Sequence, residues 1–274
     1  MNAETVWKVW RRILREPGLQ QALAAQTPED LASKFSFEPS EIPVLAAYAA
    51  TPERTGWFIT NYRFRIVNSY LHALETGAPL TLRALMGAGF TWQDLASDFL
   101  DRHGWRDYGP YVYTYAADVL DDLAANDDTA RLPGLRDLIA VEAAAVALVR
   151  RHAEPVPVQP APPGSIRLTG RGTVVTVEHA LTPWLKDKSR LGRAPLEART
   201  QHLLVYLPSI ESHHRLASLS DLAAAAYRAL ATPADGAGLA ARLAGGGHDV
   251  ADLDAAVERL TAYGVVERVT GAAD

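Results

Sequence analysis

The residues His202-Leu203-Leu204-Val205-Tyr206-Leu207 decide the fold that we predict for this chain. They form an almost unbroken apolar run that Pro208 ends, which is typical of a β-strand. A second strand is predicted at Ser212–Ser220, where Leu216 stands apart from its polar neighbours. The polar character of the second strand indicates that it lies at the edge of the sheet.

Three short helices and a closing strand follow these two strands. Apolar spacing predicts the helices at Leu222–Ala231, Ala237–Leu243 and Val250–Tyr263. Gly264 stops the third helix, because glycine readily takes the left-handed conformation of a helix end, and Val265–Val269 forms the last strand. This order of elements is that of a small winged-helix-like α+β module.

Such a module supports two unrelated functions. Its third helix can enter the major groove of DNA, or its exposed strand edge and the neighbouring groove can hold a peptide. The acidic residues of the third helix and its start outnumber the one arginine, Arg259, and are Asp249, Asp252, Asp254 and Glu258. Because these charges would repel phosphates, peptide binding is favoured over DNA binding.

The apolar side of the same helix is predicted to pack on the sheet. Its residues recur at helical spacing and are Leu253, Ala256, Val257 and Leu260. The margin of this stripe can form one wall of a peptide groove beside the edge strand.

Composition limits the remaining classes of function. The 274 residues carry a formal net charge of −5 and include no cysteine. The charge does not favour nucleic acid or an anionic membrane as a partner, and the missing thiols exclude disulfides and cysteine-based metal sites within this chain. No apolar run approaches the length of a membrane span. The start of the chain lacks the pattern of a signal peptide, so we expect a soluble, cytoplasmic protein.

A proline-rich stretch is predicted to divide the chain. Residues 154–164, EPVPVQPAPPG, hold five prolines in eleven positions and indicate a semi-rigid linker. Residues 1–153 are predicted to form a helical domain, and residues 165–274 the winged-helix-like domain. At the start of the second domain, Ile166–Thr169 and Thr173–Val177 are predicted to form a hairpin around Gly170-Arg171-Gly172.

The helices expected in the first domain are set by apolar spacing and by proline at helix starts. They include one around Trp7–Leu14, one that begins at Thr27-Pro28, and those at Ser40–Ala50, Gly56–Glu75, Pro79–Ala88, Trp92–Arg102, Pro110–Ala125 and Leu135–His152.

No pattern of catalytic residues is apparent. His213 and His214 are adjacent on a predicted strand, so their side chains point to opposite faces and do not share a metal ion. Asp121-Asp122, with Asp127, is similar to the first metal motif of terpene synthases, but the second motif of that family is missing and a solvated acidic face is favoured. We therefore predict no catalytic residue, no metal ligand and no cofactor on this chain.

Aromatic residues are dense in two segments of the helical domain. They are Trp57, Phe58, Tyr62, Phe64 and Tyr70 in the first and Trp105, Tyr108, Tyr111, Tyr113 and Tyr115 in the second. Most are expected to pack between helices. The others are typical of a protein–protein interface, where tyrosine, tryptophan and arginine are enriched.

The second domain resembles the precursor-peptide recognition elements of pathways that make ribosomal peptide natural products, the PqqD-like fold. The strands His202–Leu207 and His213–Leu219, the helix from Asp221 and the closing Leu260–Val266 carry this resemblance.

The first domain resembles the helical domain of partner proteins that accompany multinuclear non-haem iron oxidative enzymes (MNIOs), a group that includes the methanobactin and bufferin partner proteins. The matching residues are Tyr62-Arg63, Ile66, Ser69-Tyr70, Ala73-Leu74, Pro79, Leu85, Gly87, Phe90, Phe99–His103, the tyrosine-rich segment to Leu123, and Pro133–Glu142. The chain departs from the family where two asparagines are replaced by Phe64 and Arg65, where Ala78-Pro79 replaces Phe-Pro, and at Ala143, where the family has an aromatic residue.

The resemblance implies a non-catalytic subunit in a heterodimer with an MNIO-type oxidase, which would carry the iron. The chain would bind the leader of a precursor peptide as an added strand and present the rest of the peptide to the enzyme. The expected peptide-binding residues are Ser212, His213, His214, Arg215, Leu216, Ala217, Leu219, Leu253, Val257 and Leu260. The expected enzyme interface contains Tyr62, Arg63, Arg65, Tyr111 and Tyr113.

Two alternatives stay open. One is a winged-helix transcription regulator with a helical sensor domain. The other, more remote, is an independent helical enzyme of the terpene-synthase kind.

Overall fold

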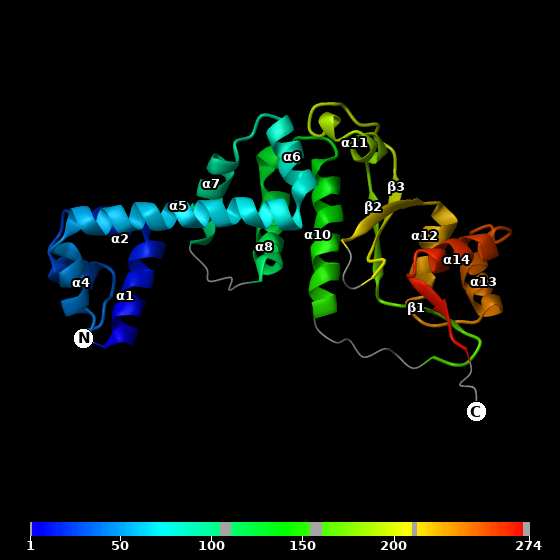
Figure 1. Ribbon diagram of the computed structural model, residues 1–274, viewed down its shortest axis with the longest axis horizontal. Coiled ribbons are helices and arrows are strands. Elements are labelled where there is room, and N and C mark those ends of the chain that lie inside the picture. The colour runs from blue at the N-terminus through cyan, green and yellow to red at the C-terminus, as the bar shows by residue number, and fades with distance from the viewer. Residues whose placement is uncertain (1, 105–110, 154–160, 210–212, 271–274) are drawn as a thin grey trace. The chain divides into compact units, whose positions relative to one another are not determined.

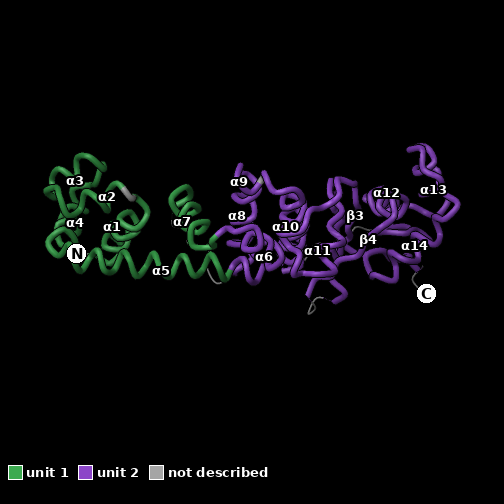
Figure 2. Tube along the Cα trace, turned by 90° about the horizontal axis from the view of Figure 1, so that it is seen from above, with its two compact units in different colours: residues 1–72, 91–110 green, residues 73–90, 111–274 purple. Residues whose placement is uncertain are grey.

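The computed structural model describes residues 2–104, 111–153, 161–209 and 213–270 of the chain. Helices and small antiparallel sheets make up the fold, so the α+β class is confirmed. The chain forms two compact units, coloured separately in Figure 2. Unit 1 contains residues 1–72 and 91–110, and unit 2 contains residues 73–90 and 111–274.

Unit 1 is helical, as predicted. Its core is apolar and includes Val9, Ile13, Leu31 and Leu45. The predicted helix start at Thr27-Pro28 is confirmed, because the Thr27 side chain accepts a hydrogen bond from the Asp30 amide at 3.2 Å. The helices of this unit are α1 (Ala3–Arg15), α2 (Pro17–Ala22), α3 (Pro28–Lys34), α4 (Ile42–Ala49), α7 (Trp92–His103) and the part of α5 (Pro52–Gly77) that precedes Ala73.

Unit 2 combines further helices with the strands. Its first part contains the end of α5, α6 (Pro79–Gly87), α8 (Val112–Ala125), α9 (Asp127–Ala130) and α10 (Leu135–Ala153). Next come β1 (Ile166–Leu168), β2 (Gly172–Val177), α11 (Thr182–Lys186) and the 3-10 helix η1 (Lys188–Arg190). The predicted order of strands and helices then follows, with β3 (Gln201–Tyr206), β4 (Arg215–Leu219), α12 (Asp221–Ala229), α13 (Gly236–Gly245), α14 (Leu253–Ala262) and β5 (Val266–Arg268).

The antiparallel sheet β2-β3-β4 is covered on both faces. Helix α10 packs on β2 and β3 from one side, and α12 and α14 lie on the other (Figure 1). Leu204 belongs to the core on the side of α12, whereas Leu203 and Val205 point to the opposite face because side chains alternate along a strand. All three are buried, which explains why the β3 sequence is continuously apolar.

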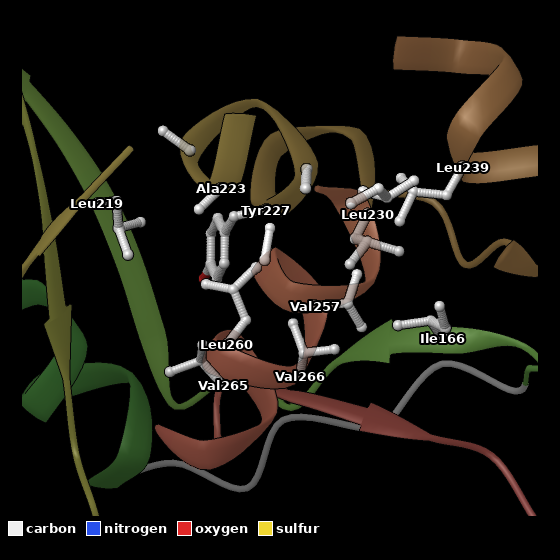
Figure 3. Close-up of a cluster of buried hydrophobic side chains, with 14 of the residues drawn as sticks. Ile166, Leu219, Ala223, Tyr227, Leu230, Leu239, Val257, Leu260, Val265 and Val266 are labelled. Atoms are coloured by element: carbon white, nitrogen blue, oxygen red, sulfur yellow. The ribbon is translucent and has the colours of Figure 1, made fainter. Parts of the chain in front are cut away.

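The core on the side of α12 is built around Tyr227. Its ring lies among side chains from α12, α14 and the strands, including Leu219, Leu260 and Val265 (Figure 3). The Tyr227 hydroxyl donates a hydrogen bond to the Gly172 carbonyl oxygen at 2.5 Å. Burial raises the pKa of this hydroxyl to about 12, so the phenol stays protonated and keeps this link between α12 and β2 at all ordinary pH values.

The predicted hairpin between Ile166–Thr169 and Thr173–Val177 is wrong. Strand β1 pairs with β5 instead, with Ile166 opposite Arg268, and β2 pairs with β3. The segment between them carries the chain from one sheet to the other, and Gly170 supplies a positive φ of 78° for this turn. The Thr169 side chain donates to the Gly264 carbonyl oxygen at 2.7 Å, which holds the end of β1 beside β5 rather than beside β2.

The two compact units have different bounds from the predicted domains 1–153 and 165–274. Helix α10 joins the sheet, because Asp137 accepts hydrogen bonds from the amides of Glu178 and His179 at 3.1 and 2.9 Å. Most of the predicted linker 154–164, residues 154–160, lies outside the described residues. After it, the Gly164 amide donates to the Val269 carbonyl oxygen at 2.8 Å, so the stretch before β1 is held against β5.

A buried carboxylate caps helix α6. Ala78 precedes this helix and offers no side-chain cap, but Glu142 of α10 accepts hydrogen bonds from the Leu80 and Thr81 amides at 2.9 and 2.6 Å. Burial raises the pKa of the Glu142 carboxyl to about 7, although these hydrogen bonds act in the opposite direction. The Glu142 side chain therefore links α10 to α6, and its carboxyl group titrates near neutral pH.

This arrangement predicts a pH-dependent contribution to stability. Because the carboxyl titrates near 4.5 when unfolded and near 7 when folded, its contribution is complete below about pH 4.5 and is lost as the pH rises through about 7. The loss should amount to about 3 kcal/mol. We expect the free-energy advantage of the wild type over Glu142→Gln, measured by urea unfolding, to shrink over this range.

The exposed Glu53 offers a matched control, because Glu53→Gln also removes one carboxylate from a helix N-terminus, the first turn of α5, but at an exposed position. The difference between the wild type and Glu53→Gln should stay small across the same pH range. An advantage over Glu142→Gln that is constant, or that grows with pH, would contradict the assignment.

Candidate functional site

Strand β4 is the edge of its sheet. It pairs with β3 on one side, with Leu216 opposite Val205, and no strand among the described residues pairs with its other side. Arg215 and Ser218 are exposed, as is common on edge strands, while Leu219 is buried in the core. Ser212, the first residue predicted for this strand, lies outside the described residues.

The backbone of β4 offers hydrogen-bonding groups in two directions. In an antiparallel pair, the amides of successive residues point alternately toward the partner strand and away from it. Leu216 and Ser218 therefore share one direction, and Arg215, Ala217 and Leu219 share the other. One of these two sets faces away from β3 and can pair with an added strand.

The three α14 residues predicted to line the peptide groove are instead core residues. The exposed fractions of Leu253, Val257 and Leu260 are 7%, 2% and 0%. Their side chains pack against α12, as Figure 3 shows for Val257 and Leu260. The apolar stripe is thus fully used in holding the fold, and a peptide on β4 would meet other surfaces.

A cavity of about 700 Å³ lies at the start of β4, and we call it the Tyr/His cavity. The predicted peptide-binding residues His213 and His214 line it together with Tyr111 and Tyr113, which the sequence assigned to a separate enzyme interface. Val149, His152 and Ala153 at the end of α10 and Leu207 after β3 complete this part of the wall. All of these residues belong to unit 2.

The walls of the Tyr/His cavity offer aromatic faces and hydrogen-bonding groups. The rings of Tyr111 and Tyr113 are 5.5 Å apart, and His152 Nε2 is 3.2 Å from the Gly170 carbonyl oxygen. Burial, and secondly the charge of His213, lowers the pKa of the His214 imidazole, and burial raises the pKa of the Tyr111 hydroxyl. Both groups are therefore neutral at pH 7 and can donate and accept hydrogen bonds.

The other residues of the predicted enzyme interface lie on α5, in unit 1. Arg63 forms an ion pair with Asp101 at 2.8 Å, and Arg65 is exposed. The sequence analysis placed the neighbouring aromatic residues in a dense segment but did not separate those that are exposed from those that pack between helices. Trp57, Phe58 and Phe64 expose 60%, 44% and 66% of their area. Exposed apolar side chains of this size, next to arginines, are typical of protein interfaces.

Metal-ligating residue types are scattered in the part of the chain that the structure describes. Among the residues that the structure describes, no three histidine, aspartate or glutamate side chains lie together as a metal site would require. In the aspartate motif on α8, Asp122 is buried and Asp121 is exposed, so the two do not form one surface. None of the described helices combines the length and the apolar character that a membrane crossing requires.

Comparison with known proteins assigns this chain to no family. The sequence matches no protein-family model, and it matches none of the curated proteins. The function has to be argued from the residues and their geometry.

The environment of His214 makes a prediction for the free protein. Its imidazole should titrate below the usual range of histidine, because burial and the neighbouring His213 both disfavour its charged form. The change His213→Gln removes one of the two causes and should raise the pKa of His214 while burial still keeps it below normal. Ring signals followed by NMR during a pH titration measure both values. A His214 pKa above the usual range, or one that falls in His213→Gln, would contradict this account of the cavity.

Proposed function

We propose that this chain is a non-catalytic subunit that binds the leader of a ribosomally made precursor peptide and holds it for an iron-dependent oxidase of the MNIO type. The leader adds as a strand to the outer edge of β4. The iron and the oxidation chemistry belong to the partner enzyme. The observation that carries the proposal is the edge position of β4, next to the Tyr/His cavity.

The sheet is well suited to strand addition. Main-chain hydrogen bonds supply most of the affinity in this mode of recognition, and side-chain pockets supply specificity. Burial of both faces holds β3 in place, and β4 is fixed to β3 along its length. The peptide therefore meets an edge that is already ordered, which reduces the entropy lost on binding.

A second surface is needed for the enzyme, and the exposed part of α5 supplies a candidate. Trp57 and Phe64 lie seven positions apart, two helical turns, and so share one side of the helix. Arg65 follows Phe64 and is exposed. A surface with exposed aromatic side chains and an arginine provides the residue types on which binding energy concentrates in protein interfaces.

Proline in β4 tests the peptide site. Leu216→Pro removes an amide donor and fixes φ, so it should block strand addition if this amide faces outward. The expected loss is about 1–2 kcal/mol, or about tenfold or more in leader affinity, measured by fluorescence polarisation with the leader encoded beside this chain. Circular dichroism must show that the variant remains folded.

A leader with N-methylated amides at alternate positions gives an independent test that leaves the protein unchanged. Methylation of one alternate set should abolish binding, whereas methylation of the other set should be tolerated, because only one set faces β4. Equal affinity of both methylated leaders and the unmodified one would place the peptide elsewhere.

Co-purification tests the enzyme surface. Trp57→Ala and Phe64→Ala should each weaken the complex with the oxidase encoded nearby by about tenfold or more, because aromatic residues at the centre of an interface commonly contribute more than about 2 kcal/mol. Met86→Ala is the matched control, since Met86 exposes 54% of its area but lies on α6 in unit 2. Equal effects of all three variants, or none, would exclude this surface.

The acidic face of α14 predicts weak DNA binding or none. Asp252, Asp254 and Glu258 are exposed on or just before this helix. An electrophoretic mobility assay with the duplex upstream of its own operon should give no retarded band at micromolar protein. Tight binding that weakens with salt would favour the alternative, a winged-helix transcription regulator.

A further inference from the structure

The Tyr/His cavity continues into a groove along α8 and α10. A second cavity, of about 530 Å³, shares Tyr111 and Ala153 with it. A third, of about 400 Å³, shares Ala147 and Arg150 with the second. We call the second and third cavities together the helix groove. Because each cavity shares lining residues with the next, the three cavities are neighbours along α8 and α10.

Small side chains line much of the helix groove. Ala147 lines both of its cavities, and Ala117, Ala143 and Ala144 line the third. Small side chains allow the backbone of an extended ligand to come close. From Tyr111 to Asp121 the groove follows α8 for about 15 Å, which suits about four or five residues of extended peptide.

Two arginines give the helix groove its charge. Arg150 and Arg151 are exposed in the last turn of α10, and within the described part of the chain neither forms an ion pair. Placement near a helix C-terminus stabilises α10 only modestly, so these guanidinium groups keep most of their capacity to bind carboxylates. Carboxylates line the outer ends, with Glu75 in the Tyr/His cavity and Asp121 in the third cavity.

We infer that the helix groove binds an acidic segment of the same peptide that adds to β4. This inference rests on the proposed strand addition. His213 and His214 lie just before β4 and line the Tyr/His cavity, so a peptide that leaves the edge at this end enters the cavity next to Tyr111. From there it passes the exposed Arg150 and Arg151, where its carboxylates find partners. The two arginines of the groove outnumber its one carboxylate, Asp121, whereas the whole chain carries a net charge of −5.

Synthetic peptides test the preference for acid. The probes are fluorescein-labelled peptides of about sixteen residues, with one half of alternating valine and threonine and the other half containing four glutamates, four lysines or four glutamines. Each is made with the charged half at either end. In fluorescence polarisation with the full chain, we expect the better glutamate probe to bind at least tenfold more tightly than the glutamine probe, and the lysine probe most weakly. Tight binding of the lysine probe, or no binding of any probe up to about 1 mM, would overturn the inference.

Two double variants of equal charge locate the effect. Arg150→Gln with Arg151→Gln should bring the affinity for the glutamate probe down to that for the glutamine probe. Arg131→Gln with Arg199→Gln removes the same charge from exposed arginines outside the groove and should leave the preference intact. Equal losses in both variants would mean that only the overall charge matters. A preference that survives in the first variant would place the acidic segment elsewhere.

The same titrations separate this inference from strand addition. If Leu216→Pro weakens all three probes while the Arg150 and Arg151 variant changes nothing, strand addition stands and the groove inference fails. If the arginine variant removes the acid preference but Leu216→Pro has no effect, the groove binds acidic peptide without an added strand.

The absence of cysteine allows a direct check of occupancy. Ala147→Cys creates a single thiol in the helix groove, and Ala231→Cys creates one on an exposed position after α12. The glutamate probe should slow alkylation of the thiol at position 147 by several fold and leave the thiol at position 231 unaffected. Equal alkylation rates at position 147 with and without bound probe would overturn the inference.

Discussion

Burial of β3 on both of its faces is the constraint on which the rest of unit 2 depends. A strand covered on one side needs apolar residues at alternate positions, but Leu203, Leu204 and Val205 are all buried. Helix α10 covers one face and the C-terminal helices cover the other, so the sheet that contains β3 links the two helical layers. Removal of either layer would expose apolar side chains and cost about 1.5–3 kcal/mol for each one uncovered.

Side-chain hydrogen bonds also hold α10 in its place against the sheet. Asp137 binds the chain after β2, and Glu142 caps α6, so this helix is fixed in position at both the sheet and its neighbour. Both residues lie in the segment Pro133–Glu142. Their hydrogen bonds give them a structural role. Residues that bind a partner have to be sought elsewhere, on the exposed part of α5, the edge of β4 and the cavities beside α10.

The sequence predicted the local features of the fold well. The order of strands and helices from β3 to β5 follows from apolar spacing and from Gly264, which are properties of neighbouring residues. Strand pairing was harder, because β1 and β2 are both good strand sequences and nothing local distinguishes a hairpin from two strands that pair elsewhere. The long-range pairing of β1 with β5 decided that outcome.

The candidate site was predictable only in part. The histidines just before β4 and the tyrosines at the start of α8 were each recognised, but their meeting in one cavity depends on how α10 packs on the sheet. The burial of Leu253 and Val257 likewise depends on α12, which covers the side of α14 that the sequence left open. A pattern of spacing identifies the apolar side of a helix, but it does not say whether any of that side remains uncovered.

The pairing of β1 with β5 has a consequence for synthesis on the ribosome. Ile166 lies opposite Arg268, so about one hundred residues separate two strands that must meet. Until residue 268 has left the exit tunnel, β5 cannot pair with β1, and Ile166 lacks part of the core that buries it in the finished fold. The apolar strand β3 is made well before α14 can cover it. The nascent chain therefore exposes the apolar surface of an incomplete sheet for several seconds. Chaperones bind exposed apolar surface of this kind.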